Sequence, residues 1–443
     1  MKGLQYLYLK VNIIYRPILK ILFTGILISA CGNLEKTERE SGTQQVQASS
    51  PEELFNIHEQ LVLDNSVQSI QLYKKGNRRS APVFSLNSND LLVLSFDYLQ
   101  LEARQFRISF THHNPDWKRS NLAREFFQDG FYQITFGPGQ ISESRRPVYR
   151  SYSFEFPNNE VQFKTSGNYM LHVEDFNSGN LIFSLPFFIH ENEGQIRSRV
   201  ETIIAPRRNL RITHLPSGRY IMPEFVDEPE FDLQFYFFQN QFWGRPKHAL
   251  ELYFSNENDS YFELRRESAF VGDYEFIPLN LDEISQDAPR ILSADPAANP
   301  PRIELNEDTQ GFSKAANFAG NRFGFPEQKP SARYAEVMFK FNPADDYPPE
   351  TQMYLVGDFN NWAIESGQKL EYDSSLQRWT TKALIKEGSY LYKYILLDNN
   401  RVDDLALDNE LQNRTQQYHA FAYFFDQTQF YYRLLQVNEF RGR

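Results

Sequence analysis

The sequence predicts an all-β protein made of three successive β-sandwich domains. The 443 residues are enough for about three domains of about 150 residues each. Aromatic residues, which favour pleated and half-buried strands, make up 15% of the chain. From about residue 66 onward, short alternating runs are separated by Asn, Gly and Pro, as expected for strands joined by turns.

Residues 1–30 have the features of a lipoprotein signal peptide. Four basic residues accompany the apolar run 21–28, and small residues come directly before Cys31. An apolar run of about ten residues is too short for a membrane span, which needs about 20. The segment 28–31 resembles a bacterial lipobox, which implies that the Cys31 thiol receives a lipid and becomes the new amino terminus. Several acyl chains on Cys31 would hold the protein stably on a membrane.

Residues 31–62 are expected to form a disordered tether between this anchor and the folded domains. The segment 32–52 is rich in Glu, Gln, Ser and Thr and has few apolar positions. Such a composition cannot bury enough apolar surface to offset the conformational entropy lost on folding.

The first folded domain is expected over residues 63–190. About seven short strands separated by turn signals favour a sandwich of immunoglobulin-like build, without the cysteine pair of antibody domains. One short helix is expected over residues 120–127, with Ser120 at its start. The clearest strands are expected at residues 67–73, 91–96, 106–110, 148–156, 169–173 and 181–189.

A middle β domain is expected over residues 195–333, and a third sandwich over residues 334–443. The segments 288–301 and 311–325 lack clear periodicity and are expected to be long loops. The clearest strands of these two domains are expected at residues 211–214, 231–238, 249–254, 336–341, 352–356, 379–384 and 389–397.

The charge and the cysteine content limit the classes of function that the protein can have. The net charge is −11, and without the first thirty residues the 42 remaining basic residues face 57 acidic ones, which makes −15. This balance argues against a nucleic-acid partner. One cysteine allows no disulfide within the chain. No phosphate-binding loop, dinucleotide fingerprint, HExxH or Gly-x-Ser-x-Gly motif is present, so no catalytic residue, cofactor or small-molecule substrate is assigned.

The densest polar cluster runs from His112 to Trp117. On a strand, adjacent histidines point to opposite faces, so His112 and His113 are poorly placed to bind one metal ion. We therefore predict a turn whose Trp117 packs into the sandwich, and no metal site. A glycosidase would need two carboxyl groups about 5 to 9 Å apart, and Asp97 with Asp116, or Asp403 with Asp404, could be chosen only arbitrarily.

Residues 353–362 predict an apolar strand, a Gly/Asn turn and then Trp362. Together with Trp379 and the segment 388–394, they resemble the early-set sandwich that includes glycogen- and starch-binding modules. The resemblance would place a sugar-stacking indole at Trp362 and a hydrogen-bonding amine at Lys393. Residues 398–401 depart from it, because a second tryptophan is expected there. The alternative is that Trp362 caps the core of its own domain.

In order and spacing, motifs along residues 65–397 resemble the plug protein family of the type IX secretion system. Two departures are His113, where the family often has cysteine, and the lipobox itself. The matching stretches are 67–73, 94–99, 112–117, 149–158, 166–169, 183–189, 239–243, 272–276 and 357–362.

The resemblance implies a mechanical, non-enzymatic function. Members of the family are taken to occlude the periplasmic mouth of a large outer-membrane β-barrel translocon. We therefore expect a plug that is lipid-anchored at the outer membrane on its periplasmic face, with the barrel as partner. A glycan-binding surface lipoprotein that uses Trp362 is the alternative. Exposed aromatic residues, such as 131–132 or 323–325, are candidates for the barrel contact.

Overall fold

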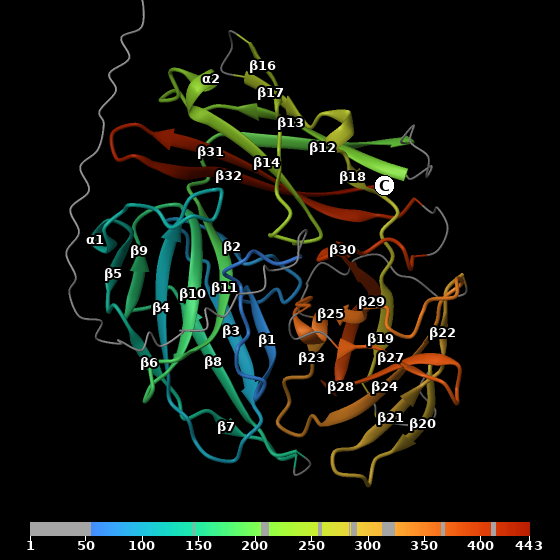
Figure 1. The fold of residues 1–443 in the computed structure, drawn as a ribbon. Helices are drawn as coiled ribbons and strands as arrows, with labels where there is room; N and C mark the ends of the chain where they lie inside the picture. Colours follow the sequence, from blue (N-terminus) through green and yellow to red (C-terminus); the bar gives the residue numbers. More distant parts are fainter. Residues whose placement is uncertain are drawn as a thin grey trace, which may run out of the picture. The chain divides into compact units, whose positions relative to one another are not determined.

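The computed structural model describes residues 55–144, 147–204, 212–255, 259–282, 284, 290–311, 324–364, 368–408 and 413–443. All of them belong to one compact unit, Ser49–Arg443. Its sheets pair into three sandwiches, so the predicted all-β class of successive sandwiches is confirmed (Figure 1). In the described part of the chain, no helix has the length and apolar character needed to cross a membrane.

The first sandwich packs a four-stranded sheet, β1-β3-β8-β7, against a five-stranded sheet, β2-β11-β10-β4-β6. In β4, Phe106, Ile108 and Phe110 are buried while the residues between them are partly exposed, which is the alternation read in the sequence. The four-stranded sheet contains β1 (Val67–Lys74), β3 (Leu92–Tyr98), β8 (Arg150–Phe156) and β7 (Gln140–Ile141). The five-stranded sheet contains β2 (Val83–Ser85), β11 (Leu181–His190), β10 (Gly167–Asp175), β4 (Phe106–His113) and β6 (Ile134–Phe136).

The first sandwich also carries a two-stranded sheet and a single helical turn. The two-stranded sheet pairs β5 (Gln128–Gly130) with β9 (Val161–Phe163), and α1 covers only Arg124–Phe127. The helix expected from residue 120 is therefore shorter than predicted. The Ser120 hydroxyl bonds the His112 ring at 2.8 Å instead of capping a helix, which explains the later start.

The middle sandwich joins strands from two distant parts of the chain. Its core stacks Phe235 on Phe262, with ring centroids 4.1 Å apart. One sheet contains β12 (Gln195–Ile204), β13 (Ile212–Ile221), β17 (Asp259–Glu263), β16 (Glu251–Ser255) and, paired with β13, β18 (Phe270–Val271). The other contains β15 (Lys247–His248), β14 (Leu233–Gln239), β31 (Gln416–Asp426) and β32 (Tyr431–Gly442), and the helical turns α2 (Pro229–Asp232) and η1 (Arg266–Ser268) lie on the connections.

The third sandwich packs two six-stranded sheets, with Phe339 of one sheet against Tyr392 of the other at 5.2 Å. One sheet contains β19 (Ile277–Asn280), β29 (Gly388–Asp398), β25 (Met353–Gly357), β26 (Gln368–Lys369), β23 (Phe325–Pro326) and β30 (Arg401–Asp403). The other contains β20 (Ile291–Asp295), β21 (Arg302–Leu305), β24 (Tyr334–Asn342), β28 (Arg378–Lys386), β27 (Glu371–Asp373) and β22 (Asp308–Thr309). The turn η2 (Asp358–Asn360) follows β25.

Strand pairing divides the chain differently from the boundaries expected from the sequence. The first sandwich lies within the expected segment 63–190. Strands β19 to β23 join the third sandwich, although they lie in the segment 195–333 assigned to the middle domain. Strands β31 and β32 join the middle sandwich, although they lie in the segment 334–443. The segment 288–301, expected to be a loop, contains β20. The reason is long-range backbone pairing, such as that of β14 with β31, which local alternation does not encode.

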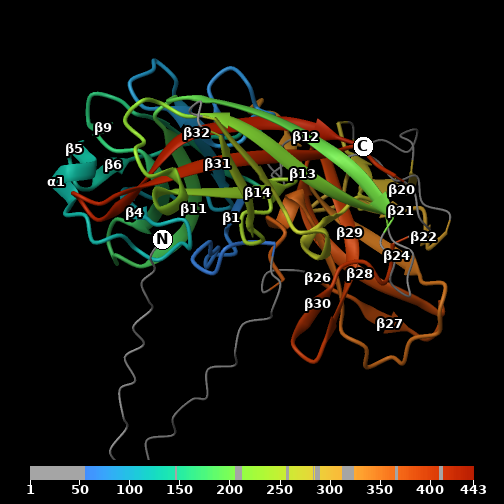
Figure 2. The same cartoon turned by 90° about the horizontal axis from the view of Figure 1, so that it is seen from above.

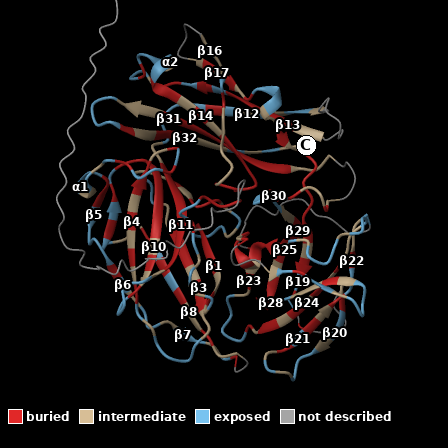
Figure 3. Cartoon of the chain, in the orientation of Figure 1, coloured by how far each residue is buried: buried red, intermediate tan, exposed pale blue. Residues whose placement is uncertain are grey.

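The middle sandwich packs against both of the others, and its long strands lie over them in Figures 1 and 2. Against the first sandwich, Phe188 of β11 packs on Trp243 at 4.7 Å and on Phe421 of β31 at 4.9 Å. Against the third sandwich, Arg245 pairs with Asp404 at 2.6 Å. Figure 3 shows that buried residues run through all three sandwiches. Apolar and ionic contacts therefore fasten the middle sandwich to both neighbours.

Candidate functional site at the junction of the first and third sandwiches

The outer face of the β1-β3-β8 sheet carries mostly small or polar side chains. Leu72, Leu94 and Phe154 point into the core, so their neighbours along each strand point outward. Strand register places the outward residues in rows across the sheet. One row joins Gln71, Ser95 and Ser153, and the row beside it joins Asp97 and Ser151.

A groove of about 860 Å³ lies over this face. One side is formed by residues 135–140, which lead from β6 to β7, and the other by residues 326–328 of the third sandwich. Its volume is within the range of about 300–1,000 Å³ that is usual for ligand pockets. The groove is therefore large enough for a ligand, and Asp97 and Lys386 lie in its lining.

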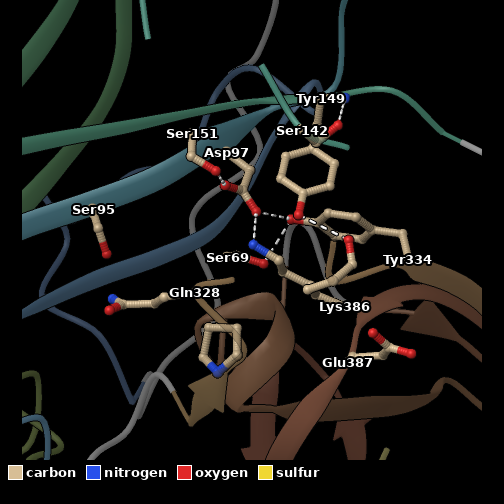
Figure 4. Close-up of polar contacts among 12 residues, drawn as sticks. Ser69, Ser95, Asp97, Ser142, Tyr149, Ser151, Gln328, Tyr334, Lys386 and Glu387 are labelled. Atoms are coloured by element: carbon tan, nitrogen blue, oxygen red, sulfur yellow. Dashed lines mark hydrogen bonds and ion pairs between the residues drawn. The ribbon is translucent and has the colours of Figure 1, made fainter. Parts of the chain in front are cut away.

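Asp97 and Lys386 form a buried ion pair across the junction (Figure 4). The Lys386 ammonium donates to Asp97 Oδ2 at 2.7 Å, and the two side chains are 4% and 5% exposed. Tyr334 donates to the same oxygen at 2.7 Å, and Ser151 donates to Asp97 Oδ1 at 2.7 Å. Three donors from two sandwiches therefore satisfy one carboxylate. A buried pair of this kind needs such additional hydrogen bonds to compensate for its desolvation.

Aromatic rings complete the surroundings of the pair. The Lys386 ammonium lies 4.6 Å from the ring centroid of Tyr149, a cation–π distance. Burial, with the charge of Asp97 as a second cause, raises the pKa of Tyr334 well above its ordinary value. The same two causes raise the pKa of Tyr149. Both phenols therefore stay protonated at neutral pH and act as hydrogen-bond donors. Their role is to hold the two sandwiches together.

A segment of the third sandwich, residues 324–332, lies against the first sandwich, and we call it the strap. Four of its backbone carbonyls accept hydrogen bonds from the first sandwich. The donors are Gln71 Nε2 to Gly324 at 3.1 Å, Arg78 Nη2 to Pro326 at 2.7 Å, Glu143 N to Pro330 at 2.8 Å and Tyr149 Oη to Ala332 at 2.8 Å. The strap and the ion pair together fasten the first sandwich to the third.

The residues proposed for sugar binding are buried. Trp362 is 1% exposed, and its ring packs on Phe242 at 5.3 Å and Phe276 at 5.5 Å, at the contact of the middle and third sandwiches. Lys393 is 2% exposed and pairs with Asp408 at 2.9 Å. Burial raises the pKa of Asp408 to about 7, and the charge of Lys393 opposes that rise. Neither side chain presents a surface on which a sugar ring could stack.

The histidine cluster is used for internal hydrogen bonds. His112 bonds the Ser120 hydroxyl at 2.8 Å and the Ser166 carbonyl at 3.0 Å. His113 bonds the Trp117 carbonyl at 2.7 Å, and Trp117 is buried. Within the described ranges, no group of three or more His, Cys, Asp or Glu side chains is placed to hold a metal ion.

The carboxylates considered for hydrolysis have separate surroundings. Asp116 is exposed and pairs with Lys118 at 2.8 Å, whereas Asp97 is buried in the ion pair. Asp403 is exposed and accepts backbone N–H groups, whereas Asp404 is buried against Arg245 and Tyr274. Each of these acids has partners of its own, so neither combination forms a pair that faces a common cleft.

The remaining candidates are the aromatic residues considered for the barrel contact and the expected lipidation site. Phe131 and Tyr132 are 62% and 52% exposed, so they are available for contacts. Phe325 is partly buried, and Phe323 lies outside the described residues, as does the expected lipidation site Cys31. The partnership of Asp97 with Lys386 was missed from the sequence. In the sequence, each of the two residues is only a charged residue near the end of an apolar run. That pattern does not predict which residues will pair.

Comparison with known proteins found a family that matches part of the chain and a solved structure that shares the fold. Residues 67–191 match the family described as type 9 secretion system plug protein, first domain. A crystal structure of a hypothetical protein from Parabacteroides merdae shares the fold, with a TM-score of 0.76 and 22% identity over 86% of this chain and 98% of that chain.

Another solved structure, the C-terminal domain of the AgI/II polypeptide BspA from Streptococcus agalactiae, has a TM-score of only 0.16. Its identity is 8%, over 84% of this chain and 98% of that chain, so it supports no conclusion about fold. No curated protein matches the chain.

Proposed function

We propose that the protein is a plug of the outer-membrane translocon, on the premise that residues 67–191 match the family of type 9 secretion system plug protein first domains. In this role it occludes the periplasmic mouth of a large β-barrel and gates it without catalysis. The family match, which ties the chain to the secretion machinery, is the observation that carries the proposal.

The build of the protein suits a mechanical role. A plug has to keep its shape when an interface with the barrel forms and breaks. The Asp97–Lys386 pair and the strap join the first sandwich to the third, and the Phe188 cluster joins the first to the middle. The acids and histidines singled out for chemistry are held in hydrogen bonds and ion pairs within the fold. These contacts support a rigid body rather than a reactive centre.

We place the plug at the outer membrane through a lipid on Cys31, facing the periplasm. The tether expected over residues 31–62 is too long, because residues 55–62 belong to the fold: Phe55 and Ile57 are buried, and Phe55 packs on Phe242 at 4.8 Å. A tether that ends before Phe55 would keep the sandwiches close to the barrel and raise their effective concentration there without any new contact. The net charge of −15 after removal of the signal favours solubility at such a local concentration.

Co-purification tests the proposal. The tagged chain is isolated from its native envelope in mild detergent, and the proteins recovered with it are identified by mass spectrometry. We expect a large outer-membrane β-barrel. Recovery of no barrel, under conditions that keep other outer-membrane complexes intact, would overturn the proposal.

Exposed aromatic residues provide the first surface to test in the same experiment. Phe131→Ser combined with Tyr132→Ser removes two exposed rings of the first sandwich. The matched control is Leu292→Ser on β20, where the leucine is 55% exposed. If the barrel is held through residues 131–132, the double variant recovers less of it and the control recovers the normal amount. Equal recovery would exclude these two residues as the contact and leave the plug role standing.

A further inference from the structure

We propose that the groove over β1, β3 and β8 binds an extended polypeptide segment of low charge, through hydrogen bonds to its backbone. This inference rests on the groove alone and does not require the plug role. It assigns a ligand class to a part of the molecule that the proposed function leaves unused.

The groove floor offers hydrogen-bonding groups on short side chains. The row Gln71, Ser95 and Ser153 crosses three strands, and the parallel row Tyr73, Val93 and Glu155 lies beside it. Gln71 is buried, and its amide is already bonded to the strap and to Arg78. The groups open to a ligand are Ser153, Thr135 and Gln140 of the lining, which are exposed, and Ser95, which is partly exposed. Hydroxyls and amides can donate to carbonyls and accept from N–H groups, so they suit a peptide backbone of any sequence.

The same face already binds a polypeptide. Gln71 and Arg78 on the β1 side donate to the strap carbonyls of Gly324 and Pro326. The side chain of Gln328 donates to the Tyr73 hydroxyl at 3.0 Å. The strap covers only one side of the groove, and the remaining face presents side chains of similar chemistry. An added segment would therefore lie beside the strap and repeat its mode of binding.

Charge in the groove favours an uncharged occupant. Lys75 pairs with Glu155 at 2.7 Å, and Lys386 pairs with Asp97. The fifth charged group of the lining, Glu327, lies 4.0 Å from Lys329. Because opposite charges are paired within the protein, the groove has no strong field to attract an acidic or basic ligand.

Aromatic exposure favours a polypeptide over a glycan. Sugar-binding sites use an exposed ring as a stacking platform. Three of the four aromatic residues of the lining are nearly inaccessible, with exposed fractions of 6% for Tyr73, 2% for Phe96 and 2% for Tyr152. The fourth, Phe136, is partly exposed and packs against the core of the first sandwich. The groove thus supplies hydrogen bonds but no fully exposed ring, which favours recognition of a peptide backbone over stacking on a sugar.

Fluorescence anisotropy with a defined peptide tests the inference. The probe is a fluorescein-labelled octapeptide of Thr, Ser, Gln and Val with capped ends, added to the lipidated full chain in mild detergent. Ser153→Trp fills the groove, and Ser293→Trp places the same ring at an exposed strand position of the third sandwich. We expect saturable binding that Ser153→Trp weakens at least tenfold and Ser293→Trp leaves within twofold.

A second measurement covers the case in which Ser153→Trp does not fold. Ser153→Cys, labelled with an environment-sensitive dye, should report peptide addition, and labelled Ser293→Cys should not. No saturable binding, or equal binding by the wild type and Ser153→Trp, would overturn the inference. Binding of maltoheptaose that Ser153→Trp abolishes, with no binding of the peptide, would also overturn it and would assign the groove to glycans.

Discussion

At the scale of single residues, the junctions between sandwiches depend on charges that have been removed from water. The Asp97–Lys386 pair is one example, and Arg245–Asp404 is another. Removing one partner of such a pair leaves an uncompensated buried charge, which is far more costly than losing a surface pair. The junction between the first and third sandwiches is therefore sensitive to a single substitution.

We predict that Lys386→Met lowers the free energy of unfolding by about 3 kcal/mol, because Asp97 keeps its hydroxyl donors but loses its counter-ion. Urea-induced unfolding followed by fluorescence measures the change. The matched control is Lys382→Met on the same strand. Lys382 pairs with Glu336 at 3.0 Å with 57% and 34% exposure, so its loss should cost under about 1 kcal/mol.

Adding Asp97→Asn to Lys386→Met removes the uncompensated charge and should recover part of the lost stability. Equal costs for Lys386→Met and Lys382→Met would contradict the importance of the buried pair.

The buried histidines predict acid sensitivity of the first sandwich. Burial lowers the pKa of His112 to about 4, against an ordinary value of 6.5, and the pKa values of His172 and His190 also fall to about 4. Between these limits the unfolded chain binds protons that the folded chain does not. The contribution of these histidines to the free energy of unfolding is therefore fully present above about pH 6.5, and it decreases as the pH falls toward 4.

His112→Gln should make this pH dependence shallower by about 1.4 kcal/mol per pH unit within that window, because one such group is removed. Unfolding in urea at pH 7, 6 and 5 measures the slope. The exposed His58 provides the control, and His58→Gln should leave the slope as it is. A wild-type slope in His112→Gln would show that this ring does not contribute.

At the scale of elements, the last two strands complete a sandwich that begins more than two hundred residues earlier. Strand β31 lies between β14 and β32, and Phe421 of β31 also packs on Phe188 of the first sandwich. The chain order and the spatial order of the strands therefore differ. Loss of the C-terminal hairpin should damage the middle sandwich and spare the third.

Truncation tests this arrangement. A chain that ends at Thr415 lacks β31 and β32 and leaves one edge of β14 unpaired. We expect limited proteolysis to cut it within residues 195–271, while the third sandwich resists. A chain that ends at Phe440 keeps nearly all of the hairpin and should behave as the wild type does. Early cleavage within residues 334–408 of the shorter chain would contradict the observed pairing.

At the scale of the whole molecule, attachment to the membrane and stability of the fold depend on different parts of the chain. The sandwiches are held by packing and buried pairs, whereas attachment to a membrane depends on the proposed lipid at Cys31. Cys31→Ala should therefore release the folded protein from the membrane fraction without changing its stability. Fractionation of cells, with thermal unfolding of the recovered protein, measures both. A variant that remains with the membranes would contradict the anchor.

Several elements were predictable from the sequence because their signals are local. Strand β4 alternates residue by residue, and β3 begins with a nearly continuous apolar run. The short β20 was missed because it lies in a Pro- and Ala-rich stretch with four of its five residues outside the buried core. The C-terminal hairpin was not identified, although both its strands are long.

The sequence by itself determined the all-β class, most strand positions in the first sandwich, and the family resemblance that the match over residues 67–191 confirms. Each of these depends on residue order over short distances. Only the tertiary structure decided that β31 pairs with β14, that Trp362 is buried between two sandwiches, and that Asp97 meets Lys386. These outcomes join residues far apart in the chain, and their free energy comes from desolvation and packing that exist only after the sandwiches have met.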